Sequence, residues 1–426
     1  MLLIKNSYRI DPRSGQEGIC DILLRGGKVA RIGDAGTWED TADAPVYDAH
    51  GLIAAPGLVD VHVHFRDPGF TYKEDIESGS RAAARGGFTT VVLMANTKPA
   101  VDNAKTLSYV LKKGNGTGIH VESCCSVTEG LKGKKLTDMS ELLQAGAAGF
   151  TDDGIPLLEE ETARQAMRMA AELGAVLSFH EEDPAYITNN GIHAGAASAY
   201  YGIGGSPREA EISMVERDIR LALETGAVVN FQHISTKEAV ALIREAKKRG
   251  TNIHAEATPH HFTLNEEAAI RFGTLAKMNP PLREESDRLA IIEGLRDGSI
   301  DLIATDHAPH SSEEKAKPLT EAPSGIIGLE TALPLGITSL VEPGHLTMME
   351  LLRKMTWNPA SLYRFDRGYL AEGGPADLVL FDPKQKQVMR RFASKSSNTP
   401  FAGMELTGKV MCTICRGEIV YRAQEQ

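Results

Sequence analysis

The chain has 426 residues and a formal net charge of −11, so it is long enough for a barrel of ~250 residues and a smaller second unit. This charge balance offers no basic surface for nucleic acid, and an anionic substrate would need local cationic groups. Because the five cysteines are odd in number and no run of ~18 apolar residues occurs, we expect a cytoplasmic protein without disulfides that does not enter membranes.

The hydrophobic pattern divides the chain into three parts. Residues 1–55 predict short strands separated by glycine turns. From residue 56 the pattern changes to a repeat of apolar strand, polar loop and amphipathic helix. It predicts buried strands at residues 58–64, 89–94, 118–124, 147–152, 175–180, 227–233, 252–257 and 301–306. Apolar residues at three- and four-residue spacing indicate helices at 162–173, 209–225, 236–249 and 285–296.

Eight strands alternating with helices predict an α/β protein with a (β/α)₈ TIM-like barrel over residues 56–363. Short strands return at residues 376–381, 387–389 and 409–420. We therefore expect the two chain ends, 1–55 and 364–426, to form one small composite β-sandwich domain, with the barrel inserted between them.

Histidine and aspartate residues close five of the predicted barrel strands. His62 and His64 close the first, and they point the same way because side chains alternate along a strand. The residues that close the fourth, fifth, sixth and eighth strands are Asp152 with Asp153, His180, His233 and Asp306.

Taken singly, a histidine at a strand end is more often a packed core residue than a metal ligand, and an aspartate there can cap a loop. However, active sites of such barrels lie at the C-terminal ends of the strands, where all these residues fall. Imidazole and carboxylate groups are ligands for zinc and similar metals. The pattern therefore predicts a two-metal hydrolytic site at one end of the barrel.

Six motifs carry a resemblance that covers essentially the whole chain. They are residues 60–69 (DVHVHFRDPG), 96–99 (NTKP), 149–154 (GFTDDG), 258–261 (TPHH), 278–283 (MNPPLR) and 305–310 (TDHAPH). In these motifs the chain resembles the amidohydrolase superfamily and, within it, the class I dihydroorotases. The resemblance implies a metal-dependent cyclic amide hydrolase.

Many such relatives bridge two metals with a carboxylated lysine at the end of strand four, but no lysine occurs between Lys135 and Lys237. Class I dihydroorotases have an aspartate there, which matches Asp153, and Asp152 stays the alternate because strand parity is unknown. The resemblance implies two Zn²⁺ per subunit: one on His62, His64 and Asp306, one on His180 and His233, with Asp153 between them.

The resemblance also implies a mechanism and a substrate. Asp306 would act as general base and then general acid beside a hydroxide that bridges the metals. The family reaction is the reversible cyclisation of N-carbamoyl-L-aspartate to L-dihydroorotate plus water, in the de novo biosynthesis of pyrimidines (UMP). The implied substrate-binding residues are His64, Arg66, Asn96, Asn279, His310, Ser324 and Gly325. Among them, Arg66 has the planar guanidinium that binds a carboxylate bidentately.

Two other functions stay open. A hydantoinase, dihydropyrimidinase or allantoinase would act on neutral rings. Such relatives generally carry the strand-four lysine and lack the 278–283 motif, so Asp153 and Asn279 distinguish a dihydroorotase from them. An inactive homologue that scaffolds aspartate transcarbamoylase would typically have lost ligand histidines, and all of them are present here. The partners that we consider are a second copy of the chain and aspartate transcarbamoylase.

Overall fold

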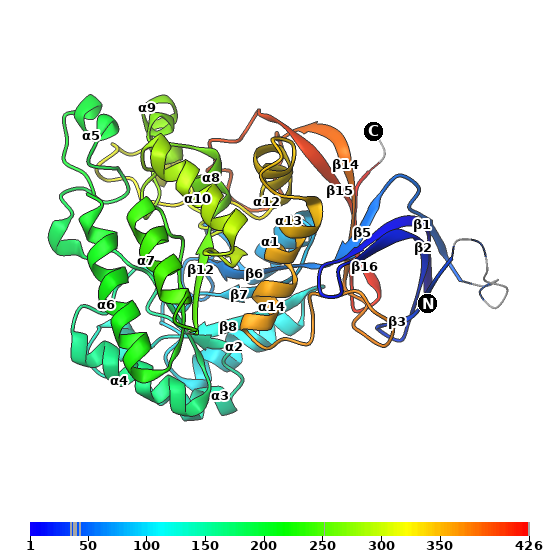
Figure 1. Ribbon diagram of the computed structural model, residues 1–426, viewed down its shortest axis with the longest axis horizontal. Helices are drawn as coiled ribbons and strands as arrows, with labels where there is room; N and C mark the ends of the chain where they lie inside the picture. The colour runs from blue at the N-terminus through cyan, green and yellow to red at the C-terminus, as the bar shows by residue number, and fades with distance from the viewer. Residues whose placement is uncertain (35, 37–40, 42–43, 251, 425–426) are drawn as a thin grey trace.

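A computed structural model describes residues 1–34, 36, 41, 44–250 and 252–424, which form a barrel and a separate sheet (Figure 1). Within these described residues, no helix has the length and apolar character needed to cross a membrane.

The separate sheet is built from both chain ends. Its N-terminal strands are β1 (Leu2–Asp11), β2 (Gln16–Arg25), β3 (Lys28–Gly33), β4 (Val46–Asp48) and β5 (Ile53–Pro56). Its C-terminal strands are β14 (Leu378–Val388), β15 (Glu405–Cys415) and β16 (Glu418–Arg422). The order is β16-β15-β14-β5-β1-β2-β3, with β4 paired to β1. The two ends join where β5 pairs antiparallel with β14, and Ile4, Ile22, Leu378 and Ile414 share one buried core. The expected union of the chain ends is therefore confirmed.

A hairpin replaces one of the predicted strands in this sheet. The stretch 409–420 was expected as a single strand, but it divides into the ends of β15 and β16. The break falls at Arg416 and Gly417, whose φ angles of 54° and 80° suit a two-residue hairpin turn. The turn at Arg416 and Gly417 thus reverses the chain within a stretch whose apolar pattern predicted one continuous strand.

The barrel consists of eight parallel strands in sequence order. They are β6 (Leu58–Val63), β7 (Phe88–Leu93), β8 (His120–Cys125), β9 (Gly149–Phe150), β10 (Val176–Phe179), β11 (Val228–Phe231), β12 (Ile253–Ala257) and β13 (Leu302–Ile303). A parallel bridge between Val63 and His307 brings the last strand back to the first. The predicted eight-stranded barrel is confirmed, although β9 and β13 are shorter than expected. Beyond β13 the backbone leaves the extended region at Asp306, where φ is 49°.

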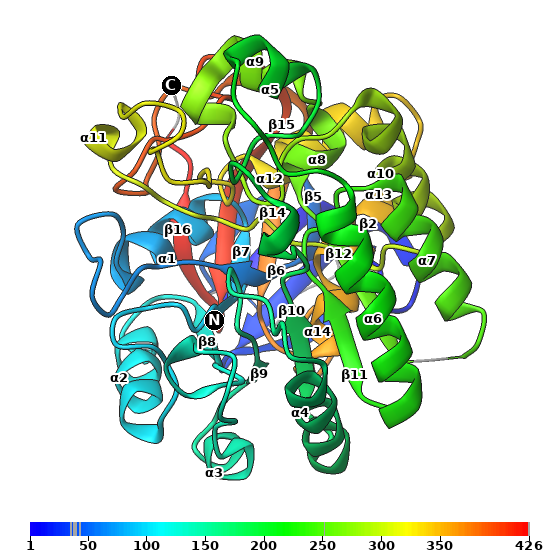
Figure 2. The same ribbon diagram turned by 90° about the vertical axis from the view of Figure 1, so that its left-hand side faces the viewer.

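Helices surround the strands, as the view along the barrel shows (Figure 2). The long ones are α1 (Ile76–Arg85), α2 (Ala104–Asn115), α4 (Glu160–Leu173), α6 (Glu209–Thr225), α7 (Lys237–Lys247) and α10 (Glu285–Asp297). The shorter ones are α3 (Met139–Gln144), α5 (Ala196–Tyr201), α8 (Pro259–Thr263), α9 (Glu267–Phe272), α11 (Ser312–Lys315), α12 (Ala332–Gly336), α13 (Met348–Met355) and α14 (Trp357–Leu362).

Local signals set the ends of these helices. Helix α7 begins where the Thr236 side chain accepts a hydrogen bond from the Ala239 N–H, and α4 ends at Gly174, whose φ of 65° is left-handed. The predicted helices agree with α4, α6, α7 and α10 to within two residues at each end.

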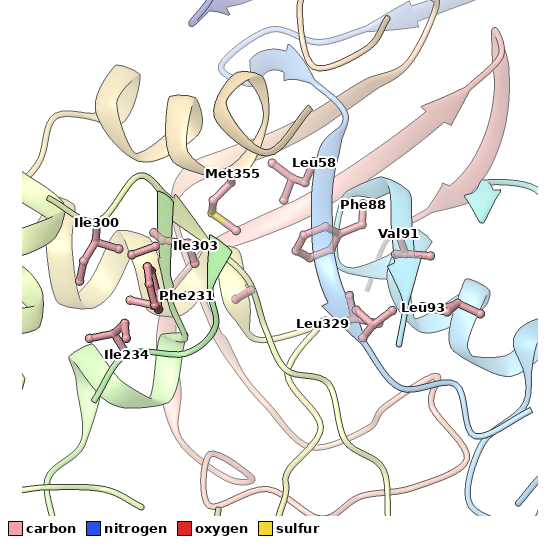
Figure 3. Close-up of a cluster of buried hydrophobic side chains, with 14 of the residues drawn as sticks. Leu58, Phe88, Val91, Leu93, Phe231, Ile234, Ile300, Ile303, Leu329 and Met355 are labelled. Carbon is pink, nitrogen blue, oxygen red and sulfur yellow. The ribbon is translucent and has the colours of Figure 1, made fainter. Parts of the chain in front are cut away.

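The main core lies between the strands and the helices (Figure 3). There, Leu58 of β6, Phe88 of β7 and Phe231 of β11 are buried with Met355 of α13. Burial of this apolar surface is the dominant stabilising contribution in such a fold.

The separate sheet contacts the N-terminal ends of the first barrel strands. The Gly57 N–H donates to the Asp377 carbonyl oxygen over 2.9 Å, and Cys415 Sγ lies 3.8 Å from the Thr89 carbonyl oxygen. This contact leaves the opposite end of the barrel, where the strands terminate, free to form a site.

Candidate active site

All the histidine and aspartate residues predicted for the metal site lie at the C-terminal ends of barrel strands. His62 belongs to β6 and His64 follows it, while His180 directly follows β10. The remaining three, Asp153, His233 and Asp306, stand two or three residues beyond β9, β11 and β13. Each of these side chains is buried. The parallel register therefore brings residues far apart in sequence to one end of the barrel.

One carboxylate lies between two pairs of histidines. Asp153 Oδ1 is 3.4 Å from His62 Nε2, and Asp153 Oδ2 is 3.4 Å from His64 Nε2. On the other side, Asp153 Oδ1 is 3.9 Å from His180 Nδ1 and 3.8 Å from His233 Nε2. In each of the two groups that share Asp153, the ligand atoms lie within 4.8 Å of one another. Asp153 is therefore the residue common to both groups.

Its neighbour Asp152 faces away from the histidines. The Asp152 carboxylate accepts hydrogen bonds from the Val127 N–H at 2.7 Å, from the Thr128 N–H at 3.2 Å, and from the Thr128 hydroxyl. Burial raises the pKa of Asp152 to about 6. Of the two aspartates that the sequence left open, only Asp153 lies between the histidine pairs.

The donor set fits divalent cations. His62 Nε2, which lies 3.4 Å from Asp153 Oδ1, is buried without a hydrogen-bond partner among the described residues. Such an orphaned nitrogen is costly unless a ligand satisfies it. Imidazole nitrogen and carboxylate oxygen are the donors that zinc prefers, and the His62 Nε2 lone pair faces Asp153 and Asp306.

Asp306 completes the first group. Its Oδ1 lies 3.0 Å from His64 Nε2 and 3.5 Å from His62 Nε2. Burial opposes ionisation, but hydrogen bonding to His64 and the charge of the neighbouring histidines lower the pKa of Asp306 below its ordinary value. This carboxylate is therefore ionised near neutral pH and can accept a proton.

Three site residues have strained backbones. Arg66, His233 and Asp306 have φ angles of 58°, 33° and 49°, a region that non-glycine residues rarely adopt. Such conformations persist where surrounding contacts hold them and cluster at functional sites. The strain supports a role for this end of the barrel that is more than packing.

The residues predicted for the substrate carboxylate lie beside the metal groups. Asn96 Oδ1 is 2.9 Å from His64 Nδ1, and Asn96 Nδ2 donates to Asp153 Oδ2 over 3.1 Å. Arg66 Nε donates to the Pro309 carbonyl oxygen over 3.3 Å, and Arg66 Nη2 lies 3.3 Å from His310 Nε2. The structure therefore brings Arg66, Asn96 and His310 to the rim of the same site.

Three further residues implied in substrate binding, Asn279, Ser324 and Gly325, lie on two adjacent segments. The Ser324 carbonyl oxygen is 2.9 Å from His310 Nε2, and the Gly325 N–H donates to the Lys277 carbonyl oxygen over 2.9 Å. Two residues along from Lys277, Asn279 has a buried side-chain oxygen without a hydrogen-bond partner among the described residues. Gly325 has a φ of 121°, and a Cβ there would lie 2.6 Å from the Ala308 Cβ.

Sequence analysis missed two buried glutamates that contact the histidines. Glu256 Oε1 on β12 lies 2.5 Å from His62 Nδ1, and Glu182 Oε2 lies 3.3 Å from His180 Nε2. An acidic residue within the apolar strand 252–257 was an available signal for Glu256. Glu182, two residues after His180, had no comparable signal.

The profile of the amidohydrolase family matches residues 53–420 of this chain. The chain therefore belongs to the amidohydrolase family, a class of enzymes that is consistent with the barrel and the two histidine groups. Within it, the dihydroorotase of Clostridioides difficile is 53% identical over 423 residues, covering 99% of this chain and 100% of the relative. The dihydroorotase of Clostridium acetobutylicum is 50% identical, covering 99% of each. These relatives confirm the expected membership of the dihydroorotase group.

Solved structures of related enzymes share the fold. An L-hydantoinase (dihydropyrimidinase) from Arthrobacter aurescens superposes with a TM-score of 0.89 and 26% identity, covering 100% of this chain and 96% of that one. A D-hydantoinase (dihydropyrimidinase) from a Thermus species gives a TM-score of 0.84 at 26% identity, covering 100% of this chain and 97% of that one. The hydantoinases are thus related in fold but about half as similar in sequence as the dihydroorotases.

Proposed function

We propose that the chain is a dihydroorotase, which interconverts N-carbamoyl-L-aspartate and L-dihydroorotate plus water in pyrimidine biosynthesis. The observation that carries the proposal is the carboxylate of Asp153 between two histidine pairs, with Asp306, Arg66 and Asn96 beside it. The dihydroorotases at 50% identity or more over the whole chain support the choice of reaction.

We propose that the site holds two Zn²⁺ per subunit. The first would be held by His62, His64 and Asp306, the second by His180 and His233, with Asp153 shared. When bound, the cations would make hydroxide available near neutral pH and polarise the attacked carbonyl group.

The protein residues then move one proton. The ionised Asp306 accepts the proton of the attacking water and returns it to the ring nitrogen as the amide bond breaks. In the reverse direction Asp306 removes a proton from the carbamoyl nitrogen as the ring closes and gives it to the departing hydroxide, which leaves as water. The same carboxylate serves both directions, because the reverse reaction retraces the forward proton transfers in the opposite order.

The substrate carboxylate is held by Arg66, Asn96 and His310, which supply local hydrogen-bond donors in a chain with a net charge of −11. His64 also borders the substrate, while the Asn279 side chain and the backbone of Ser324 and Gly325 contact the pyrimidine ring. The unpaired side-chain oxygen of Asn279 supports this assignment, since a ring N–H would satisfy it.

A second candidate is a cyclic amidase that acts on neutral rings, and the structural similarity to hydantoinases supports it. We propose a cytoplasmic enzyme in either case. A homodimer and a complex with aspartate transcarbamoylase are the assemblies that we propose to test.

The deciding experiment follows the loss of ultraviolet absorbance from dihydroorotate with the purified chain supplied with Zn²⁺. Hydantoin, dihydrouracil and an Asp306→Ala variant are run beside it. Hydrolysis of dihydroorotate alone, abolished in the variant, is the expected result. Activity on the neutral rings would instead favour the cyclic amidase, and no activity on any of the three would call for a repeat with aspartate transcarbamoylase added.

A further inference from the structure

Two of the predicted ligand histidines contact a buried carboxylate through the ring nitrogen that faces away from Asp153. His62 does so through Nδ1 with Glu256, and His180 through Nε2 with Glu182. His64 differs, because its outer nitrogen meets the neutral amide oxygen of Asn96. Each histidine pair therefore contains one ring that is paired with a carboxylate.

Glu256 is positioned by three contacts and is fully buried. Besides His62 Nδ1, it accepts a hydrogen bond from Asn230 Nδ2 over 2.9 Å and one from the His233 N–H over 3.4 Å. A buried carboxylate without partners would be strongly destabilising. The three donors therefore compensate for the burial of the Glu256 carboxylate. Of the two histidines that Glu256 contacts, only His62 does so through its ring, because His233 donates from its backbone N–H.

The contact decides which nitrogen of His62 carries the proton. An ionised carboxylate only accepts hydrogen bonds, and Glu256 at 2.5 Å is closer to Nδ1 than the Gln232 amide nitrogen at 3.3 Å, so Nδ1 is the protonated nitrogen. In the neutral ring Nε2 then keeps a lone pair, and this is the buried nitrogen without a partner that lies 3.4 Å from Asp153 Oδ1. The tautomer that Glu256 selects is the one that a metal ligand needs.

Glu182 plays the equivalent part for the second pair. Its Oε1 accepts a hydrogen bond from Ser206 Oγ over 2.9 Å. Its Oε2 has no hydrogen-bond partner among the described residues and lies at the ion-pair distance of 3.3 Å from His180 Nε2, the group that can donate to it. The other ring nitrogen, His180 Nδ1, is directed toward His233 Nε2 at 3.0 Å and toward Asp153. With Nε2 donating to Glu182, the lone pair of His180 is on Nδ1, the nitrogen that faces His233 and Asp153.

We propose that Glu256 and Glu182 are positioning residues that hold His62 and His180 in the tautomers competent for cation binding, one for each half of the site. The carboxylates also make the rings stronger donors than a neutral acceptor would. This inference rests on the metal-holding residues of the proposed function. It predicts that each glutamate controls the affinity of one cation more than that of the other.

The test replaces each carboxylate by the amide of the same size, in Glu256→Gln and Glu182→Gln. Glu330→Gln is the matched control, because Glu330 is also buried but accepts from the Ala393 N–H and pairs with Arg85. Co²⁺ is added to chelator-treated proteins, and binding is followed by visible absorption and by competition with a chelator. We expect one of the two Co²⁺ sites to weaken about 10- to 100-fold in each test variant, and neither to change in the control.

Wild-type affinity and absorption spectra in both folded test variants would overturn the proposal. If a variant does not fold, the tautomers are instead determined by NMR on the wild-type chain, labelled with ¹⁵N-histidine and with Zn²⁺ bound. Protonation at Nδ1 of His62 and Nε2 of His180 supports the proposal, and the opposite tautomers contradict it. Because the readout is cation binding, its failure is distinguishable from failure of the dihydroorotase assignment, which depends on turnover of dihydroorotate.

Discussion

The guanidinium of Arg66 provides the sharpest test of how the site selects an anionic ring. Its side chain is half-buried and lies against the Pro309 carbonyl oxygen and His310, which hold it at the rim beside the metal groups. We predict that Arg66→Lys, which keeps the positive charge but loses the planar fork, weakens recognition of the dihydroorotate carboxylate. The backbone strain at φ 58° is common to both residues and cancels in the comparison.

The expected loss in kcat/KM follows from the number of hydrogen bonds that Arg66→Lys removes. A bidentate contact between guanidinium and carboxylate has two charge-assisted bonds, each contributing about 1.5 to 3 kcal/mol. The lysine ammonium is a point charge without the planar fork, so the variant loses about one of the two charge-assisted hydrogen bonds. At about 1.4 kcal/mol for each tenfold change, kcat/KM for dihydroorotate should fall by about 10- to 140-fold, mainly through a higher KM.

The assay is steady-state hydrolysis of dihydroorotate, with bound cation measured on each protein so that metal loss is not mistaken for weaker substrate binding. Arg271→Lys is the matched control, because Arg271 is exposed and its guanidinium lies over the ring of its neighbour Phe272. A kcat/KM for Arg66→Lys equal to that of the wild-type chain, at equal cation content, would refute the carboxylate contact.

Four further predictions follow from the site and its surroundings. Asp153→Asn should lose affinity for both cations, whereas Asp152→Asn should keep both and lower the free energy of unfolding by about 1 to 3 kcal/mol, as measured by metal analysis and denaturant titration. Asp306→Asn should reduce kcat by about 10²- to 10⁴-fold in the absorbance assay, and a kcat near that of the wild-type chain would exclude its role in proton transfer. Gly325→Ala, strained at φ 121° and overpacked against Ala308, should raise KM and cost about 1 to 3 kcal/mol of stability in thermal unfolding. Burial raises the pKa of Glu330 from its ordinary value of 4.5 to about 7, so between these pH values the folded state binds more protons than the unfolded state, and stability falls as pH rises. The melting temperature of Glu330→Gln minus that of the wild-type chain should therefore increase between about pH 5 and about pH 8. A difference in melting temperature that does not change with pH would contradict the raised pKa of Glu330.

Much of the fold and of the site was predictable from sequence because the signals are local. The strand and helix periods distinguish the barrel from the chain ends, and buried parallel strands are apolar along their whole length. His62 and His64 lie two residues apart, so strand geometry alone places them on one face. The C-terminal position of Asp153, His180 and Asp306 on their strands was equally readable, because such barrels assemble sites at that end.

Other features depended on contacts between distant segments. Asp152 and Asp153 are neighbours, and only the contacts of Val127 and Thr128 with Asp152 decide which of them faces the histidines. Glu256 is 194 residues from His62 in sequence, and the periodicity of the two segments does not predict that these residues pair. The sequence by itself determined the barrel, its repeat and the residue types at the strand ends, since these follow from local side-chain alternation and burial. Only the tertiary structure decided which carboxylate is shared and which nitrogen of each imidazole is free, because both depend on the register between strands.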